Sequence, residues 1–391
     1  MSLTKLTYFF CVLVVAFTPL DALEITQGSN VTLGRYFFIL MAASALFSGS
    51  LRLKRTIPIF NILVCFIVWA FFTSLWSVDI EVTLGRIAYL LQYAIIFVVM
   101  VNVLNSPRRL SVAMIGWILG TSYIAYMSAM DFSANADMTD GLYRVSEFGN
   151  PNENSFMLCY ALVFCFLIDK TKMRLLSILF AAFAAFTIIA NGSRMGVIMF
   201  VASMLAFCVE LWQAKKRWYV LALIPAFIFM GAYEFNHIPT ATLMRILGIT
   251  SDIEEGNTAH RNEIWRAALV MIQYNPLYAL IGCGWGAFQI AIKHYYGVAI
   301  GAHNFYLDLL TTTGVVGLSI VLRYLWKLFL LIKKTFKSNV MNYMMLLLPM
   351  ISMMSTNWQS RRWWFMMGAF IYLIYITKNF TKDGTSVRTS R

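Results

Sequence analysis

The sequence is a long series of apolar runs, each close to the length of a membrane span and separated from the next by a polar connection. Crossing the ~30 Å hydrocarbon core of a bilayer takes roughly 20 apolar residues in a helix, which pairs its own backbone polar groups. The pattern predicts an all-α polytopic membrane protein of about twelve transmembrane helices, with 1–391 as one integral-membrane domain. The spans are expected at about 6–22, 35–50, 57–77, 84–104, 110–130, 154–168, 174–190, 194–213, 218–235, 304–325, 340–356 and 362–377.

The composition excludes a water-soluble fold. Hydrophobic residues make up 60% of the chain and charged residues only 13%, whereas a soluble domain carries roughly 25% charged residues. The interior of a globule grows too slowly with chain length to hide so much apolar surface. The bilayer must therefore be the solvent for most of the sequence.

The net charge of +13 does not indicate a nucleic-acid partner, because of where the charges lie. The basic residues form short clusters between apolar runs, such as Arg108-Arg109 and Lys215-Lys216-Arg217, and these clusters fall on alternate connections. Cytoplasmic loops retain Lys and Arg in this way. The alternation predicts a multi-pass inner-membrane protein with both the N- and the C-terminus in the cytoplasm.

The first apolar run has two interpretations. Lys5 followed by an apolar stretch that ends near Ala22 is compatible with a cleaved signal peptide. The run is long and its small-residue cleavage pattern is poor, so we favour a retained first helix. Cleavage would leave the alternation of the later loops unchanged.

Two connections on the predicted periplasmic side are long, at roughly 131–153 and 236–303. Loops longer than ~12–15 residues are uncommon in compact structures and are often functional. All four histidines lie in or at the end of the second loop. No nucleotide-binding G-x-x-x-x-G-K-[ST] motif occurs, so we expect the chemistry to take place on the periplasmic side without a nucleotide-driven motor.

The second loop contains a predicted helix. Residues 259–274 place apolar side chains at helical spacing, and Arg261 and Trp265 are neighbours on one face of that helix. Asn275-Pro276 ends the helix, because the residue before a proline is disfavoured in the α region.

Two further motifs follow in the same loop. A glycine-dense turn occupies 282–286; either its backbone approaches a ligand closely or it is a tight turn alone. Ala302-His303-Asn304 then leads directly into the tenth span, which contains Gly314 and Gly317.

Two earlier motifs are Gly149-Asn150-Pro151-Asn152, at the end of the first loop, and Asn191-Gly192-Ser193-Arg194, before the eighth span. In this order the motifs resemble the bacterial O-antigen polymerase/ligase family, over 145–320 by motif and over the whole chain by span count and loop layout. The resemblance implies a fold like that of the integral-membrane type C glycosyltransferases. It also implies transfer of glycan from undecaprenyl diphosphate on the periplasmic face, with no metal and no other cofactor.

The family resemblance leaves the acceptor open. A polymerase extends another lipid-linked repeat unit of O-antigen or surface polysaccharide, and a ligase transfers the glycan to lipid A-core. The Gly149-to-Asn152 turn favours the polymerase. The expected partners are the undecaprenyl-diphosphate-linked glycan and membrane lipid, with a chain-length regulator or flippase in addition.

The chemistry of this reaction suggests roles for individual residues. The leaving diphosphate needs positive charge, and the planar donors of arginine pair with phosphate oxygens. We expect Arg194, Arg261, Arg144 and Asn152 to bind the diphosphate, with Arg261 also catalytic. His303 is the expected catalytic base, because imidazole titrates near neutral pH.

Each role has a simpler alternative. Arg194 is also placed to anchor a helix at the headgroups, Arg261 to pair with Glu263, and His303 to cap or pack a helix. A zinc site is not expected, because no His-x-x-x-His or Cys-x-x-Cys spacing occurs. A flippase or secondary transporter is the main competing function, but its spans would carry charges and internal repeats that we do not find. A membrane scaffold or sensor would not need the loop motifs.

Overall fold

The computed structural model describes residues 2–20, 32–52, 58–135, 151–168, 171–213, 261–335, 340–354 and 363–382. Within these residues the regular structure is helical and contains no β-strand. The helices of the main bundle are α1 (Leu3–Phe17), α2 (Leu33–Ser48), α3 (Pro58–Phe72), α4 (Ile80–Val103), α5 (Pro107–Asn135), α6 (Pro151–Leu167), α7 (Thr171–Ala190), α8 (Arg194–Gln213), α15 (Phe305–Thr335), α16 (Val340–Ser352) and α17 (Trp363–Lys382). The 3-10 helix η1 (Thr73–Trp76) precedes α4.

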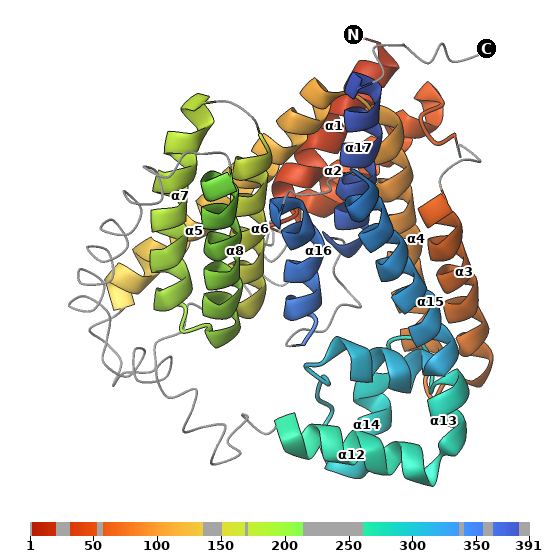
Figure 1. Cartoon of the computed structure of the whole chain (residues 1–391). Coiled ribbons are helices and arrows are strands. Elements are labelled where there is room, and N and C mark those ends of the chain that lie inside the picture. Colours follow the sequence, from red (N-terminus) through yellow and green to blue (C-terminus); the bar gives the residue numbers. More distant parts are fainter. Residues whose placement is uncertain are drawn as a thin grey trace.

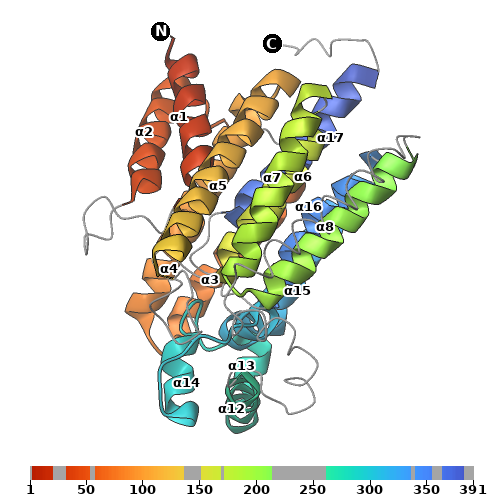
Figure 2. The ribbon, with the colours of Figure 1, turned by 90° about the vertical axis from the view of Figure 1, so that its left-hand side faces the viewer.

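Three shorter helices gather at one end of this bundle (Figure 1). They are α12 (Arg261–Tyr274), α13 (Pro276–Ile281) and α14 (Phe288–Tyr296), and we call them together the α12–α14 unit. The start of α1 and the end of α17 lie at the opposite end in both views (Figures 1 and 2). The predicted long loop 236–303 is thus helical in its described part.

The bundle helices coincide with the expected spans wherever the structure describes them, and the expected span 218–235 lies outside the described residues. Five described helices are long and apolar enough to cross a membrane by length and composition, and several shorter helices are apolar as well. The described part of the chain is therefore all-helical, as predicted, and its helices are consistent with a membrane protein. The number of crossings and the cytoplasmic termini stay predictions.

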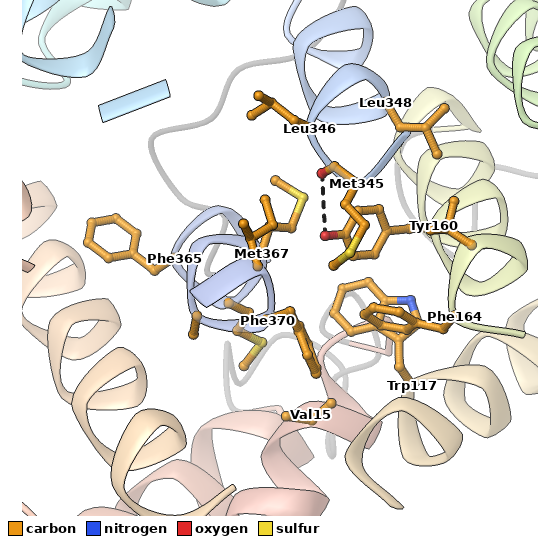
Figure 3. Packing of buried hydrophobic residues seen from close by; sticks show 14 of the residues in the cluster. Val15, Trp117, Tyr160, Phe164, Met345, Leu346, Leu348, Phe365, Met367 and Phe370 are labelled. Carbon is orange, nitrogen blue, oxygen red and sulfur yellow. Dashed lines mark hydrogen bonds between the residues drawn. The ribbon is translucent and has the colours of Figure 1, made fainter. Parts of the chain in front are cut away.

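The centre of the bundle is packed with aromatic side chains (Figure 3). Tyr160 and Phe164 of α6 lie against Trp117 of α5, with ring centroids 5.8 and 6.0 Å from the indole. Phe164 also meets Phe370 of α17 at 4.7 Å, and the Tyr160 hydroxyl reaches the carbonyl oxygen of Met345 in α16 at 3.5 Å. Offset and edge-on aromatic pairs of this kind add to the stability of apolar burial. The packing fixes α6, and with it the polar residues of its first turn, against α5, α16 and α17.

Candidate active site

The Arg-x-x-x-Trp and Ala-His-Asn motifs lie against each other in space. Trp265 Nε1 donates a hydrogen bond to the carbonyl oxygen of Ala302 at 2.9 Å. Ile264 and Ala268 of α12 pack with Phe288 of α14 and with Ala302 in one buried cluster. The apolar stripe of α12 is therefore the face that holds this helix on α14 and on the segment before α15.

His303 adopts an unusual backbone conformation. Its φ of 47° lies in the left-handed region, which few residues other than glycine adopt. Asn304 follows it and caps α15, since its side-chain oxygen accepts hydrogen bonds from the backbone N–H groups of Tyr306 at 3.1 Å and Leu307 at 3.2 Å. The capping role considered for His303 thus belongs to Asn304, an assignment that the N-cap preference for asparagine would have suggested.

His303 and Arg261 are close enough to interact electrostatically. The pKa of the half-buried His303 imidazole is lowered from its ordinary value, first by burial and then by the positive charge of Arg261. Both causes disfavour the protonated ring. The neutral ring is the form that can accept a proton, so both causes favour the state that a general base requires.

Glu263 lies on the first turn of α12. It accepts a hydrogen bond from the hydroxyl of Tyr296 at 3.3 Å, so at least one of its carboxylate oxygens faces α14. This contact adds a polar link between the two helices to the apolar cluster beneath it.

The glycine turn 282–286 forms backbone hydrogen bonds with α15. This helix leaves helical geometry at Gly314, whose φ is 69°. The carbonyl oxygens of Thr311 and Thr312 there accept hydrogen bonds from the backbone N–H groups of Cys283 at 2.8 Å and Gly284 at 3.1 Å. The turn thus replaces helical hydrogen bonds that the kink removes.

Close backbone contact explains the glycines at this junction. A Cβ atom on Gly282 would overlap with the backbone of Thr312, and one on Gly314 would overlap with the carbonyl group of Leu280. The sequence left two roles open for the glycine turn, a close approach to a ligand or a tight turn alone. The structure shows a tight turn whose backbone packs closely on the backbone of α15.

The same turn holds the start of α4. Val78 N donates to the carbonyl oxygen of Cys283 at 3.0 Å, and Trp285 N donates to the hydroxyl of Thr73 at 3.0 Å. The α12–α14 unit is thereby joined to η1 and α4 as well as to α15.

The two earlier motifs also meet. Ser193 is the N-cap of α8, because its Oγ accepts a hydrogen bond from Gly196 N at 3.0 Å, and its hydroxyl donates to Asn152 Oδ1 at 2.8 Å. Both residues lie next to Arg194, the half-buried first residue of α8. Asn191 of the same turn is fully buried, and neither polar atom of its amide has a hydrogen-bond partner among the residues that the structure describes.

Arg194 and His303 belong to the same end of the bundle. The helices α8 and α16 are packed side by side (Figure 1), and α16 ends where α15 begins, with Phe305 N donating to the carbonyl oxygen of Met353 at 2.8 Å. Asn152 reaches this end through Ser193. Arg144 lies outside the described residues.

Metal-binding side chains are not grouped in the part of the chain that the structure describes. No set of three or more His, Cys, Asp or Glu side chains there is arranged to hold a metal ion.

A comparison with known families bears on the region just described. Residues 179–322 match the family described as O-antigen ligase. The match includes Arg194, Arg261, His303 and the glycine turn, and it begins after Asn152. No curated protein matches the chain. The motif resemblance is confirmed over residues 179–322, the part of the chain that matches the O-antigen ligase family.

Proposed function

We propose that the chain is a metal-independent glycosyltransferase that uses undecaprenyl-diphosphate-linked oligosaccharide at the periplasmic face of the inner membrane. One observation carries the proposal: the imidazole of His303, whose pKa is lowered, lies within electrostatic reach of the Arg261 cation in a region that matches the O-antigen ligase family. The imidazole suits proton transfer and the guanidinium suits a diphosphate. The strained backbone of His303 supports a functional role, because such strain gathers at active sites.

The proposed reaction is a single displacement. His303 accepts the proton of the acceptor hydroxyl, whose oxygen forms a bond to C1 of the donor sugar. The bond between C1 and the diphosphate oxygen breaks, and the diphosphate leaves with the electron pair. Arg261 and Arg194 stabilise the charge that develops on it, with Arg144 as a further ligand and with Asn152 acting through Ser193 and its own amide N–H.

We favour a polymerase because of the Gly149-to-Asn152 turn. A ligase is the alternative, because the matched family is described as O-antigen ligase. Deleting the gene and separating the surface polysaccharide on a gel distinguishes them. Core carrying a single repeat unit indicates a polymerase. Core without any repeat, together with accumulated lipid-linked polymer, indicates a ligase.

Transport is the competing class. A flippase predicts that deletion leaves lipid-linked repeat units on the cytoplasmic side, where a periplasmic glycosidase or label cannot reach them. Purified protein that forms no glycan from lipid-linked donor and either acceptor would refute both versions of the transferase. A chain-length regulator or flippase as a partner stays a prediction.

The site is tested by single substitutions. We expect Arg194→Ala, Arg261→Ala and His303→Ala each to abolish transfer while the protein accumulates normally in the membrane. Arg194→Lys should recover little activity, since a lysine cannot form the planar bidentate contact. Lys293→Ala, at an exposed position of α14, is the matched control. Full activity in all three alanine variants would refute the assignment.

A further inference from the structure

Two arginines, one on α2 and one on α4, have no part in the proposed reaction. Arg35 lies in the first turn of α2, where its Nη2 donates to the hydroxyl of Tyr89 at 3.4 Å and its guanidinium carbon is 5.7 Å from the ring centroid of Tyr89. Arg86 precedes Tyr89 by three residues on α4, so the two are neighbours on one helix face. The Arg35 guanidinium thus lies near the Tyr89 ring, and Arg86 lies one turn earlier on the same face of α4; we call these residues the Arg35–Tyr89–Arg86 cluster.

The glycine turn makes room for this cluster. A Cβ atom on Gly286 would overlap with Cγ of Arg86, and Gly286 itself has a φ of 80°. The stem of Arg86 therefore lies directly on the last glycine of the turn. This contact connects the cluster to the same unit that carries Arg261.

The charge of Arg86 has no counter-charge in the described part of the chain. Its helix neighbours three and four positions away are Val82, Thr83, Tyr89 and Leu90, none of which is acidic. Arg86 is half-buried, and its side chain carries a guanidinium cation. A partly buried cation without a counter-charge is costly, and in or near a membrane such a residue indicates a functional site. The missing counter-charge is expected to come from a ligand.

The surroundings of the cluster indicate a lipid as the source of that charge. Both helices that carry the arginines also expose large apolar side chains, including Leu33 and Tyr36 on α2 and Leu84 on α4, with 41%, 52% and 44% of their surfaces accessible. Such positions on a spanning helix face acyl chains. An anion bound by Arg35 and Arg86 would therefore belong to a molecule whose tail lies in the bilayer.

Arg35 is separate from Arg194 of the proposed donor site. In the described part of the chain α2 packs on α1 and α4, whereas α8 packs on α6, α7 and α16, and α2 and α8 lie on opposite sides of the bundle in Figure 2. We infer that one lipid headgroup does not contact both arginines. The molecule accordingly offers cations for two phosphorylated lipids.

We propose that the Arg35–Tyr89–Arg86 cluster binds the phosphoryl group of the acceptor lipid, while the donor diphosphate occupies the site of Arg194 and Arg261. The assignment to the acceptor rests on the proposed function. Both acceptors considered there are phosphorylated membrane lipids, a lipid-diphosphate-linked repeat unit for a polymerase and lipid A-core for a ligase. The tyrosine orients Arg35, and the two guanidinium groups form charge-assisted hydrogen bonds to phosphate oxygens.

Lipid binding without turnover tests the site. The full-length protein in detergent is titrated with undecaprenyl diphosphate, with lipid A-core and with phosphatidylglycerol, and bound lipids are counted by native mass spectrometry. For a polymerase, the wild type binds two undecaprenyl diphosphates; Arg35→Gln with Arg86→Gln removes one and Arg194→Gln removes the other. For a ligase, the same double variant weakens lipid A-core instead. Either loss should be about tenfold or more, as expected for charged hydrogen bonds.

Arg109→Gln is the matched control, because Arg109 lies 5.3 Å from the ring centroid of Tyr8 at the other end of the bundle. Wild-type affinity of the double variant for both specific lipids would overturn the proposal. An equal loss in Arg109→Gln, or an equal loss for phosphatidylglycerol, would also overturn it, because the arginines would then be general headgroup anchors.

Folding and function are separated by two further measurements. The double variant Arg35→Lys with Arg86→Lys keeps both charges. Its thermal unfolding midpoint is compared with that of the double glutamine variant. Loss of lipid binding at an unchanged midpoint is then assigned to the site and not to folding. A protein that binds lipid through the cluster but transfers no glycan refutes the proposed function and leaves the site intact. A protein that transfers glycan while the double variant binds normally refutes the site alone.

Discussion

The indole nitrogen of Trp265 and the carbonyl oxygen of Ala302 are joined by a hydrogen bond of 2.9 Å. This bond connects the helix that begins at Arg261 to the residue immediately before His303. The proposed base and its neighbouring cation are carried by segments about forty residues apart in the chain, and Trp265 fixes one segment on the other. Their electrostatic coupling therefore depends on this contact.

Trp265→Phe should reduce glycan transfer without unfolding the protein. The phenyl ring keeps most of the packing on α14, but the buried carbonyl of Ala302 loses its donor, at a cost of ~1–3 kcal/mol. We expect about a tenfold fall in kcat or more, measured with lipid-linked donor in detergent. Trp326→Phe, at an exposed position of α15, is the control. Activity equal to the control would show that the bond does not position the site.

The titration of His303 provides a second test. Its pKa is lowered by burial and by Arg261, so its ring should lose the proton below pH 6.5, the ordinary value. Arg261→Gln removes a positive charge that disfavours the imidazolium, so the pKa should rise toward the ordinary value, whereas Arg261→Lys should change it less. NMR of labelled histidine measures this directly, since the chain has only four histidines and His303→Gln assigns the signal.

The pH dependence of transfer should follow the same group. Protonated His303 cannot accept a proton from the acceptor, so kcat/KM should fall as the pH drops through the pKa of the free enzyme. A profile whose acidic limb lies above pH 6.5 would contradict the lowered pKa of His303.

Gly314 should be one of the least replaceable glycines. Alanine there would combine a left-handed backbone with overlap against Leu280, and we expect a loss of ~2–5 kcal/mol from strain and overpacking together. Gly297 has a φ of 87° but open space around it, so Gly297→Ala isolates the strain of ~1–2 kcal/mol. Gly85→Ala, in a helix with no atom within 4 Å, should be neutral or slightly stabilising.

Thermal unfolding in detergent ranks these three variants. The midpoint should be lowest for Gly314→Ala, intermediate for Gly297→Ala and close to wild type for Gly85→Ala. If Gly314→Ala melts together with Gly297→Ala, the close packing of α13 on α15 does not contribute to stability.

Features that depend on local sequence were predictable. The stripe in 259–274 and the Asn275-Pro276 pair predicted α12 to within two residues of its observed limits, because helix periodicity and the proline rule act over a few residues. Pro276 then starts α13 in place of a loop, since proline fits the first turn of a helix. The alternation of basic loops placed Arg194 and His303 on one side, and the structure places them at one end of the bundle.

Features that depend on partners distant in the chain were not predictable. Nothing near 282–286 indicates that its N–H groups pair with Thr311 and Thr312, because the kink that frees those carbonyls lies about thirty residues further along the chain. The role of Asn191 was missed for a similar reason. Its sequence motif was noticed, but only the packing around it shows that its amide is buried and unpaired.

Asn191→Leu should separate stability from activity. The side chains have similar volume, and the replacement removes a fully buried amide that makes no hydrogen bond, so folding should be unaffected or favoured. If the amide pairs with a substrate group or an ordered water next to Arg194, turnover should fall, as happens when an unsatisfied group is kept for function. Ser128→Ala is the control, because its hydroxyl is also buried and unpaired but belongs to no motif. We expect both variants to melt at or above the wild-type temperature and only Asn191→Leu to lose activity; full activity in Asn191→Leu would assign this amide to folding alone.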